Sequence, residues 1–402
     1  MDLVRAEANP ALLILAGYWP TRQNPISGIF IVQQAAAFAA KGIRCDVLVQ
    51  VTRFRGGQDL LSTEELGLDG VMISLIEVPE FRLPEKLSSL PGAIRLNSWM
   101  IGRELSQVLR KLAEVTEYAG CIVHGVRYAG FCLSQWRRWL KCPVVAVLHG
   151  VDPFMVAPRN RSRVRNMLSR EGEFIGSLVL VGRPLRTHAE AIGLSEVTQR
   201  IIANGVVLPA KPEPRVSMEE VARPIRILSV SNLIPLKGID DNLHALARIE
   251  QKHPRLNWEY VIVGDGSIRG ELEHLTQTLG LSTRVRFQGR LSYEATQMQM
   301  GQADIFSLPS WNEAFGIVYL EAMARGVPVI GCLENGAAEI VTAGRDGLLI
   351  RPKSVEDLVV ALFELLSDPE CRLRLGVEAR NTAEGFSWGR NVDDMLAVLG
   401  IS

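Results

Sequence analysis

The stretch ADIFSLPSWNEAFGIVYLEAMARGVPVIGCLENGAAEIVTA, residues 303–343, decides the fold of this chain. Its first apolar run, residues 305–308, predicts a buried strand that ends at a proline. A loop follows, and apolar residues recur at helical spacing from Gly316 onward. A second apolar run, residues 327–330, predicts another buried strand. This order of strand, loop, helix and strand is typical of an α/β protein.

Two carboxylates lie within this stretch, Glu313 in the loop and Glu321 inside the first turns of the helix. The N-terminus of a helix offers unpaired N–H groups and partial positive charge, which suit a phosphate. A glycine such as Gly316 lets a ligand approach the backbone, and carboxylates accept hydrogen bonds from sugar hydroxyls. Taken alone, the pair would also fit a solvated helix residue and a capping residue.

The residues around the pair resemble the nucleotide-sugar glycosyltransferases of family 4, whose signature reads E-x-F-G-x-x-x-x-E-A-M-A-x-G-x-P-V-I. The matching positions are Glu313, Phe315, Gly316, Glu321, Ala322, Met323, Ala324, Gly326, Pro328, Val329 and Ile330. The resemblance implies the GT-B fold, which is an α/β architecture of two Rossmann-like, doubly wound parallel-sheet domains facing a cleft. It also implies a retaining mechanism.

Length and composition agree with a two-domain globular enzyme. The chain has 402 residues, of which 47% are hydrophobic and 22% charged, and its net charge is +0. Zero net charge gives no reason to expect a nucleic-acid partner. The six cysteines show no metal-ligand spacing and predict buried free thiols in a reducing cytosol. We find no signal-peptide pattern and no apolar run near the ~18 residues that span a bilayer, so we expect a cytoplasmic protein.

The first half begins with a strand, loop, helix and strand at residues 12–15, 16–28, 29–41 and 45–51. This order predicts the start of a doubly wound sheet. The resemblance implies that Gly28 in the loop approaches the donor diphosphate or the acceptor, and a plain tight turn is an equal alternative. The sequence of this segment resembles that of the family branch that builds bacterial cell-wall polysaccharides and exopolysaccharides. Residues 53–95 are rich in glycine and proline and predict loops.

A predicted strand at residues 144–148 ends in the sequence His-Gly-Val-Asp. Ligands of open α/β sheets bind at the carboxyl ends of strands, which makes His149 a candidate catalytic residue. The resemblance implies that this histidine reaches the donor sugar, whereas a lone histidine is more often structural. Asp152 is a second candidate, and capping of the next helix is its alternative.

A basic segment follows the histidine; its arginines are Arg159, Arg161, Arg163, Arg165 and Arg170. The segment fits an exposed helix face, or a surface that binds anionic phospholipid or a lipid-diphosphate acceptor. The spacing spreads the charges around a helix, which weakens the case for a membrane stripe. Peripheral contact with the inner face of the cell membrane is therefore a hypothesis.

Residues 207–224 are rich in proline and charge and predict a linker. We therefore place an acceptor-side domain at residues 1–210 and a donor-binding domain at residues 211–385. The resemblance implies that the C-terminal helix, within residues 386–402, packs back on the first domain.

The second half contains the segment IRILSVSNLIPLKGID, which resembles the family pattern G-R-L-x-x-x-K-G. The resemblance implies that Lys237 binds the donor diphosphate, with an exposed lysine as the alternative. Asn232 replaces the family's arginine and brings no charge, so diphosphate binding depends more on Lys237 and the helix N-terminus.

Glycine also follows the next strand, in the sequence Val263-Gly264-Asp265-Gly266. A dinucleotide fingerprint would need a third glycine where Arg269 stands and an acidic residue ~20 positions on, and both are missing. The V-G-x-G pattern of the family fits instead and makes Gly264 a candidate contact. Leu291 ends a strand and turn where family members contact the base.

We therefore predict a retaining glycosyltransferase that moves a sugar from a UDP- or GDP-sugar to an acceptor hydroxyl. The acceptor would be a glycan, a glycolipid or a lipid-linked sugar used in cell-surface polysaccharide or glycolipid synthesis. Lys237, Phe315 and Gly316 would neutralise the diphosphate, Glu321 would hold the ribose, and Glu313 and His149 would orient the sugar. No D-x-D motif occurs, so we expect no metal cofactor.

Two alternatives remain open. A nucleotide-sugar epimerase of the same fold would bind the donor and need no acceptor. A non-enzymatic sugar-binding or scaffold protein would tolerate loss of the glutamates and of His149, which are intact, and only Asn232 points that way.

Overall fold

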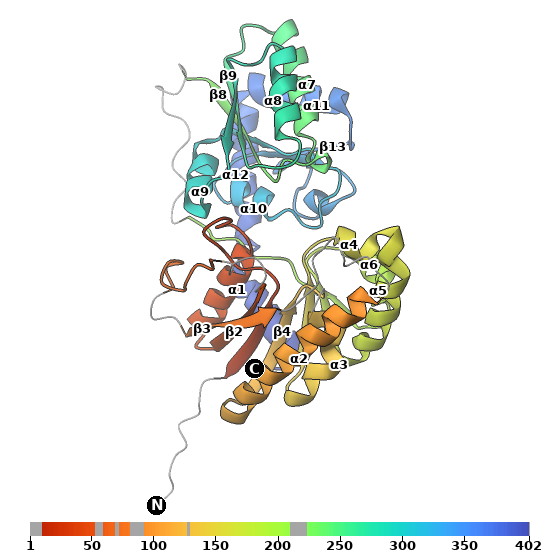
Figure 1. Cartoon of the computed structure of the whole chain (residues 1–402). Coiled ribbons are helices and arrows are strands. Elements are labelled where there is room, and N and C mark those ends of the chain that lie inside the picture. Colours follow the sequence, from red (N-terminus) through yellow and green to blue (C-terminus); the bar gives the residue numbers. More distant parts are fainter. Residues whose placement is uncertain are drawn as a thin grey trace, which may run out of the picture. The chain divides into compact units, whose positions relative to one another are not determined.

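The computed structural model describes residues 10–52, 59–68, 72–80, 92–126, 129–209 and 223–401. The chain divides into two compact units. The first unit comprises Met1–Gly205 and Trp388–Ser402, and the second comprises Val206–Ser387. Each unit holds a parallel sheet flanked by helices (Figure 1). The predicted α/β class with two Rossmann-like parallel-sheet domains is confirmed.

The described strands of the first unit lie in the order β3-β2-β1-β4-β5-β6-β7, and all neighbours are parallel. Their bounds are β1 Ala11–Ala16, β2 Arg44–Thr52, β3 Ile73–Glu80, β4 Tyr118–His124, β5 Val144–Leu148, β6 Ser177–Leu180 and β7 Gln199–Ile201. The strand order reverses between β1 and β4, and ligands of doubly wound sheets bind at such a switch point. The loops after β1, β4 and β5 are therefore expected to line a ligand site.

The described helices of the first unit lie between its strands, except that none is described between β2 and β3 and that α13 comes from the C-terminal part of the chain. They are α1 Ile29–Ala40, α2 Ala93–Val115, α3 Leu133–Trp136, α4 Pro153–Val156, α5 Pro158–Glu171, α6 Leu185–Ala191 and α13 Trp388–Leu399. The last of these, α13, joins the first unit through polar contacts with α1. Gln34 donates to Asn391 over 2.6 Å, and Trp388 donates to Gln33 over 3.0 Å.

The described strands of the second unit lie in the order β10-β9-β8-β11-β12-β13, also parallel. Their bounds are β8 Ile225–Val230, β9 Trp258–Val263, β10 Val285–Gly289, β11 Ile305–Ser307, β12 Val329–Cys332 and β13 Gly347–Ile350. The helices are α7 Ile239–Lys252, α8 Arg269–Thr278, α9 Tyr293–Gln302, α10 Ile317–Met323, α11 Val355–Ser367 and α12 Pro369–Glu384.

A buried polar network fixes α7 against this second sheet. The Asn242 side chain donates to the Tyr260 hydroxyl over 3.0 Å and accepts from the Ser307 hydroxyl over 2.7 Å. Ser229 and Tyr260 share a further hydrogen bond of 2.7 Å. Because these buried groups are partnered, the network joins α7 to β8, β9 and β11 without leaving a desolvated polar atom unpaired.

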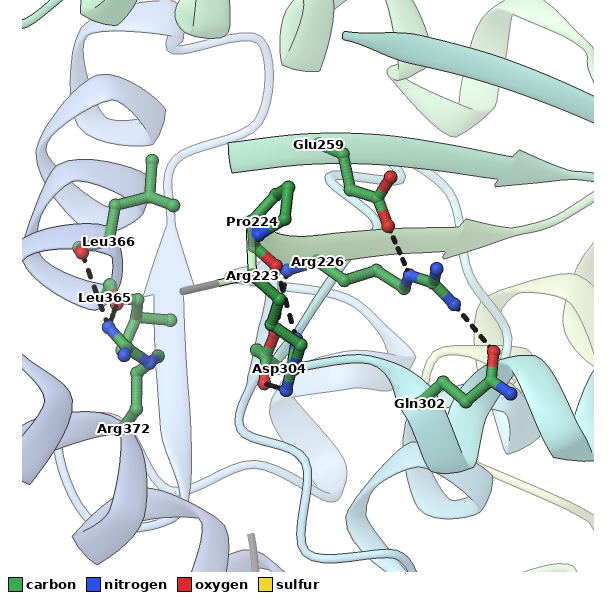
Figure 2. A network of polar contacts seen from close by, with 9 residues as sticks. All are labelled: Arg223, Pro224, Arg226, Glu259, Gln302, Asp304, Leu365, Leu366 and Arg372. Carbon is green, nitrogen blue, oxygen red and sulfur yellow. Dashed lines mark hydrogen bonds and ion pairs between the residues drawn. The ribbon is translucent and has the colours of Figure 1, made fainter. Parts of the chain in front are cut away.

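Ion pairs connect the amino-terminal ends of strands β8, β9 and β11 of this sheet (Figure 2). Arg226 in β8 donates to Glu259 in β9 over 2.6 Å. Arg223 forms two hydrogen bonds with Asp304, of 2.7 and 2.8 Å, just before β11. These ends are remote from the carboxyl ends of the strands, so we assign the network to stability.

Two local expectations were wrong. Residues 53–95 were expected to be loops, but β3 lies at Ile73–Glu80 and α2 begins at Ala93. β3 is an edge strand with Pro79 near its end, a position that an edge tolerates because one side of the strand needs no ladder partner. After the strand that ends at His124-Gly125, the sequence predicts a helix through Trp139, but the described chain there forms two 3₁₀ turns around the short α3. The glycine pair at residues 56–57 and most of the expected linker, residues 210–222, lie outside the described residues.

Candidate functional site

The second unit brings a lysine and a glutamate together at the carboxyl ends of its strands. Lys237 ends a 3₁₀ turn after β8, and Glu313 lies in the loop between β11 and α10. Lys237 Nζ donates to Glu313 Oε2 over 2.6 Å, and the two side chains are 17% and 16% exposed. Lys237 is therefore not the exposed lysine of the alternative interpretation.

Gly316 shapes the start of α10. Its φ of 86° lies in the left-handed region, and a Cβ there would stand 2.5 Å from the Tyr319 ring and 3.0 Å from Glu313 Cγ. Only glycine fits this position, where the helix N-terminus begins beside Glu313. The N-cap residue of this helix is Gly316, and the hydrogen bond that the Glu313 side chain makes within the described residues is the one with Lys237.

Contacts from a second segment hold the loop that carries Glu313. The Gly336 N–H donates to the Glu313 carbonyl over 2.8 Å, and the Asn335 side chain donates to the Ser310 carbonyl over 2.8 Å. Phe315 is buried within the same loop. Asn335 and Gly336 therefore hold the Glu313 loop in place.

Glu321 is buried on α10 and is not a solvated helix residue. Burial raises the pKa of its carboxyl from 4.5 to about 7, although Arg325 and the nearby Tyr293 and Gln297 side chains partly oppose the shift. A buried carboxyl group is a costly arrangement, and such groups gather at ligand sites.

Two loops meet near the remaining candidates of the second unit. Gly264, after β9, has a φ of 131°, and a Cβ there would stand 1.8 Å from the Ser231 carbonyl oxygen after β8. Asn232 follows at that meeting point and is exposed. Leu291 lies between β10 and α9 and is partly exposed. Gly264 is therefore required for the close approach of the two loops.

In the first unit, His149 follows β5 and contacts two aromatic groups. Its Nε2 lies 2.8 Å from Nδ1 of His124, the last residue of β4. Phe30 of α1 packs at 4.3 Å between ring centroids. Gly28 precedes α1 with a φ of 69°, and a Cβ there would stand 2.6 Å from the Tyr18 carbonyl oxygen. The loop after β1 and the end of β5 are thus brought together through Phe30.

Sequence reasoning missed His124. The signal was present, because His124-Gly125 and His149-Gly150 repeat one dipeptide at the ends of two adjacent strands. Burial lowers the pKa of His124 to about 3, and burial together with His124 holds the pKa of His149 well below its usual range. Both rings are therefore neutral at pH 7.

Asp152 lies one residue before α4 and accepts a backbone hydrogen bond from Met155 over 3.0 Å through its carbonyl. Its charge raises the pKa of buried His188, although burial leaves that pKa lowered. In the basic segment, Arg161, Arg163, Arg165 and Arg170 are exposed on α5.

Among the described residues, no group of three or more His, Cys, Asp or Glu side chains is arranged to hold a metal ion. No described helix is both long and apolar enough to cross a membrane.

Comparison with known proteins places this geometry in context. Residues 211–382 match the family described as Glycosyl transferases group 1. A Corynebacterium glutamicum protein, a GDP-mannose-dependent monoacylated alpha-(1-6)-phosphatidylinositol monomannoside mannosyltransferase, is 32% identical over 264 residues, which are 61% of this chain and 66% of that protein. A D-inositol 3-phosphate glycosyltransferase of Actinosynnema mirum is 27% identical over 401 residues, or 92% and 91% of the two chains.

Other relatives match over a shorter part of their length. A D-inositol 3-phosphate glycosyltransferase of Stackebrandtia nassauensis is 35% identical, but the match spans 41% of this chain and 39% of that protein.

Solved structures share the fold along nearly the whole chain. Sucrose-phosphate synthase from Thermosynechococcus elongatus superposes with a TM-score of 0.76 at 19% identity, covering 97% of this chain and 98% of that one. The Anabaena protein HepE, solved with UDP and glucose, gives a TM-score of 0.71 at 20% identity over 98% and 100% of the chains. These likenesses show that the fold of this chain, two Rossmann-like parallel-sheet units, is shared with those proteins.

Proposed function

We propose, from the match of residues 211–382 to the family described as Glycosyl transferases group 1, that this chain is a retaining glycosyltransferase. It would transfer a sugar from a nucleotide-diphosphate sugar to an acceptor hydroxyl. The relatives named above carry glycosyltransferase names, and the whole-length match to the Actinosynnema mirum protein supports extending the activity to the full chain.

The observation that carries the proposal is the Lys237–Glu313 pair beside the N-terminus of α10. Negative charge grows on the departing diphosphate as the glycosidic bond breaks, and a partly buried ammonium and helix N–H groups stabilise that charge. Glu313, released from the lysine, accepts hydrogen bonds from the sugar hydroxyls. Phe315 and Gly316 supply the backbone of this diphosphate site.

The other candidate residues receive supporting roles. Glu321 accepts hydrogen bonds from the ribose hydroxyls, and His149 hydrogen-bonds to the transferred sugar. Gly28 and Gly264 let ligand groups approach the backbone, and Leu291 contacts the base. Asn232 contributes a neutral hydrogen bond in place of an arginine. Asp152 remains a candidate sugar contact. Lys237 and the helix N-terminus serve as the electrophilic groups, so we propose that transfer needs no metal.

The names of the relatives support a choice of donor and acceptor. One relative is named as GDP-mannose-dependent and acts on a phosphatidylinositol monomannoside, and HepE was solved with UDP. We therefore propose a UDP- or GDP-sugar donor and a glycolipid or lipid-linked acceptor. Work on such an acceptor suits a cytoplasmic protein that contacts the inner face of the membrane, with the exposed arginines of α5 toward anionic lipid.

The first test measures thermal stabilisation by UDP, GDP, ADP and their sugars. The wild type is compared with Lys237→Met and Glu321→Ala. Two matched controls are Lys252→Met, an exposed lysine at the end of α7, and Glu294→Ala, an exposed glutamate on α9. We expect one nucleotide to stabilise the wild type and both controls, and to lose its effect on the two site variants.

The second test follows the chemistry of the nucleotide sugar identified in this way. Transfer to a lipid-linked acceptor, with the anomeric configuration of the product read by NMR, distinguishes the outcomes. Retained configuration supports the proposal, and inverted configuration contradicts the retaining mechanism. Conversion of the donor to its epimer without acceptor would establish an epimerase, and absence of any nucleotide binding would favour a scaffold.

A further inference from the structure

The two histidines that end neighbouring strands of the first unit hydrogen-bond to each other. β4 and β5 are parallel, and His124 pairs in register with Val147. The Gly125 N–H donates to the Val147 carbonyl over 2.8 Å, so the backbone after β4 is fixed to the end of β5. His124 Nδ1 and His149 Nε2 lie 2.8 Å apart, and their ring planes differ by 21°. This separation is a hydrogen-bond distance.

The outer nitrogens of the pair, His124 Nε2 and His149 Nδ1, are buried and have no hydrogen-bond partner among the described residues. In a neutral imidazole one nitrogen carries a hydrogen and the other accepts. If His124 donates from Nδ1, the unpaired N–H is on His149 Nδ1. If His149 donates from Nε2, the unpaired N–H is on His124 Nε2.

Burial decides between these two arrangements. His124 is 2% exposed, whereas His149 is partly exposed. An N–H without an acceptor is most costly where neither water nor a ligand can reach it. Both outer nitrogens are covered in this structure, but only the residue His149 is partly exposed, so a bound substrate can supply the missing acceptor only there. The first arrangement is therefore the less costly of the two. The lowered pKa of both rings agrees with a neutral pair.

We propose that His124 is a positioning residue, which donates from Nδ1 to His149 Nε2 and thereby presents His149 Nδ1–H to an oxygen of the substrate. Phe30 packs on the His149 ring and restrains the same orientation. His149 is then a neutral hydrogen-bond donor, neither a general acid nor a cation. The inference rests on the proposed function, in which His149 contacts the transferred sugar.

The tautomer can be measured directly on the full chain, without substrate. The protein has six histidines, so a ¹⁵N-histidine-labelled sample gives few imidazole signals, and spectra of His124→Phe and His149→Phe assign the pair. We expect both rings to carry hydrogen on Nδ1. A proton on Nε2 of His149 overturns the proposal. Because this measurement needs no activity, it stands even where no sugar transfer is found.

A pair of similar variants then tests the consequence for catalysis. His124→Asn keeps an amide N–H near the position of Nδ1, whereas His124→Asp offers only acceptors and forces the proton of His149 onto Nε2. We expect kcat/KM of the Asn variant within about threefold of wild type, and a loss of about 10–100-fold for the Asp variant. His188→Asn, a change at another buried histidine of the first unit, is the control.

The outcomes separate a positioning role from a merely structural one. Equal losses in the Asn and Asp variants, or wild-type activity in a folded Asp variant, contradict the proposal. Where the Asp variant fails to fold, the wild-type tautomer and the Asn variant decide. If both rings carry hydrogen on Nδ1 but the wild type transfers no sugar, the result counts against the proposed function and still supports the His124–His149 hydrogen bond.

Discussion

Lys237 and Glu313 neutralise each other across 2.6 Å, one after β8 and the other after β11. The two groups proposed for the diphosphate and the sugar are therefore held by each other when no donor is bound. In the proposed function, a donor whose diphosphate binds Lys237 would free Glu313 for the sugar, so the diphosphate and the sugar would be bound together.

The pair predicts a coupling in stability. Lys237→Met and Glu313→Gln each leave one partly buried group unpaired, and we expect each to lower the free energy of unfolding by about 1–3 kcal/mol. The double variant should lose less than the sum, because it leaves no uncompensated charge. Urea unfolding of the four proteins measures this coupling. Additive losses would show that the two side chains do not interact in solution.

Glu321 predicts an unusual dependence of stability on pH. Its pKa rises from 4.5 to about 7 on folding, so the folded state binds more protons between these values and stability falls as pH rises. Glu321→Gln removes this loss and should be more stable than wild type by about 2–3 kcal/mol at pH 8, with little gain at pH 4.5. Denaturant unfolding across this pH range measures the effect. Glu294 is exposed, so Glu294→Gln should show the same pH dependence of stability as the wild type.

The same carboxyl group predicts pH-dependent donor binding. The ionised form accepts hydrogen bonds from ribose hydroxyls, so affinity for the nucleotide sugar should rise about tenfold between pH 6 and pH 8. Calorimetric titration of wild type and Glu321→Gln measures this. The variant should bind weakly at every pH, and an identical slope in both proteins would place the titrating group elsewhere.

Gly316 predicts a steric effect that a matched glycine can isolate. Gly316 and Gly280 both have positive φ, 86° and 73°, but a Cβ at Gly280 meets nothing within 4 Å. Gly280→Ala should cost about 1–2 kcal/mol through backbone conformation alone. Gly316→Ala should cost more, because its Cβ would displace Tyr319 or Glu313, and it should also weaken donor binding. If Gly316→Ala and Gly280→Ala lose the same stability, the Glu313 loop can rearrange around the added Cβ at no further cost.

The basic face of α5 predicts binding to anionic lipid. Replacement of Arg161, Arg163, Arg165 and Arg170 by Gln should weaken sedimentation with phosphatidylserine-containing vesicles at least about tenfold, since each basic residue contributes about 1 kcal/mol. The control replaces four exposed basic residues of the second unit, Lys252, Arg255, Arg286 and Arg290. If sedimentation of the wild type does not depend on the anionic lipid content of the vesicles, the proposal of membrane contact is wrong.

The sequence predicted local elements well where their signals are local. β11, β12 and the start of α10 after Gly316 agree with the apolar runs and helical spacing of residues 303–343. β3 was missed because an edge strand among glycines and prolines lacks a long apolar run. The pairs Lys237–Glu313 and His124–His149 join residues 76 and 25 positions apart, and no local pattern encodes such contacts. Family resemblance identified one member of the histidine pair, and only the sheet order identified the other.

The chain passes into and out of the second unit at neighbouring points. The Val206 N–H donates to the Phe386 carbonyl over 2.8 Å, and Val206 forms a bridge with Ser387. Gly205 and Trp388, the residues of the first unit at the two junctions, are also close together. A Cβ on Gly205 would stand 2.5 Å from the Trp388 backbone nitrogen. Residues 206–387 thus behave as a cassette inserted at a single place in a host domain. Because the two junctions are adjacent, exchange of the second unit as one piece requires only two neighbouring points of connection to match.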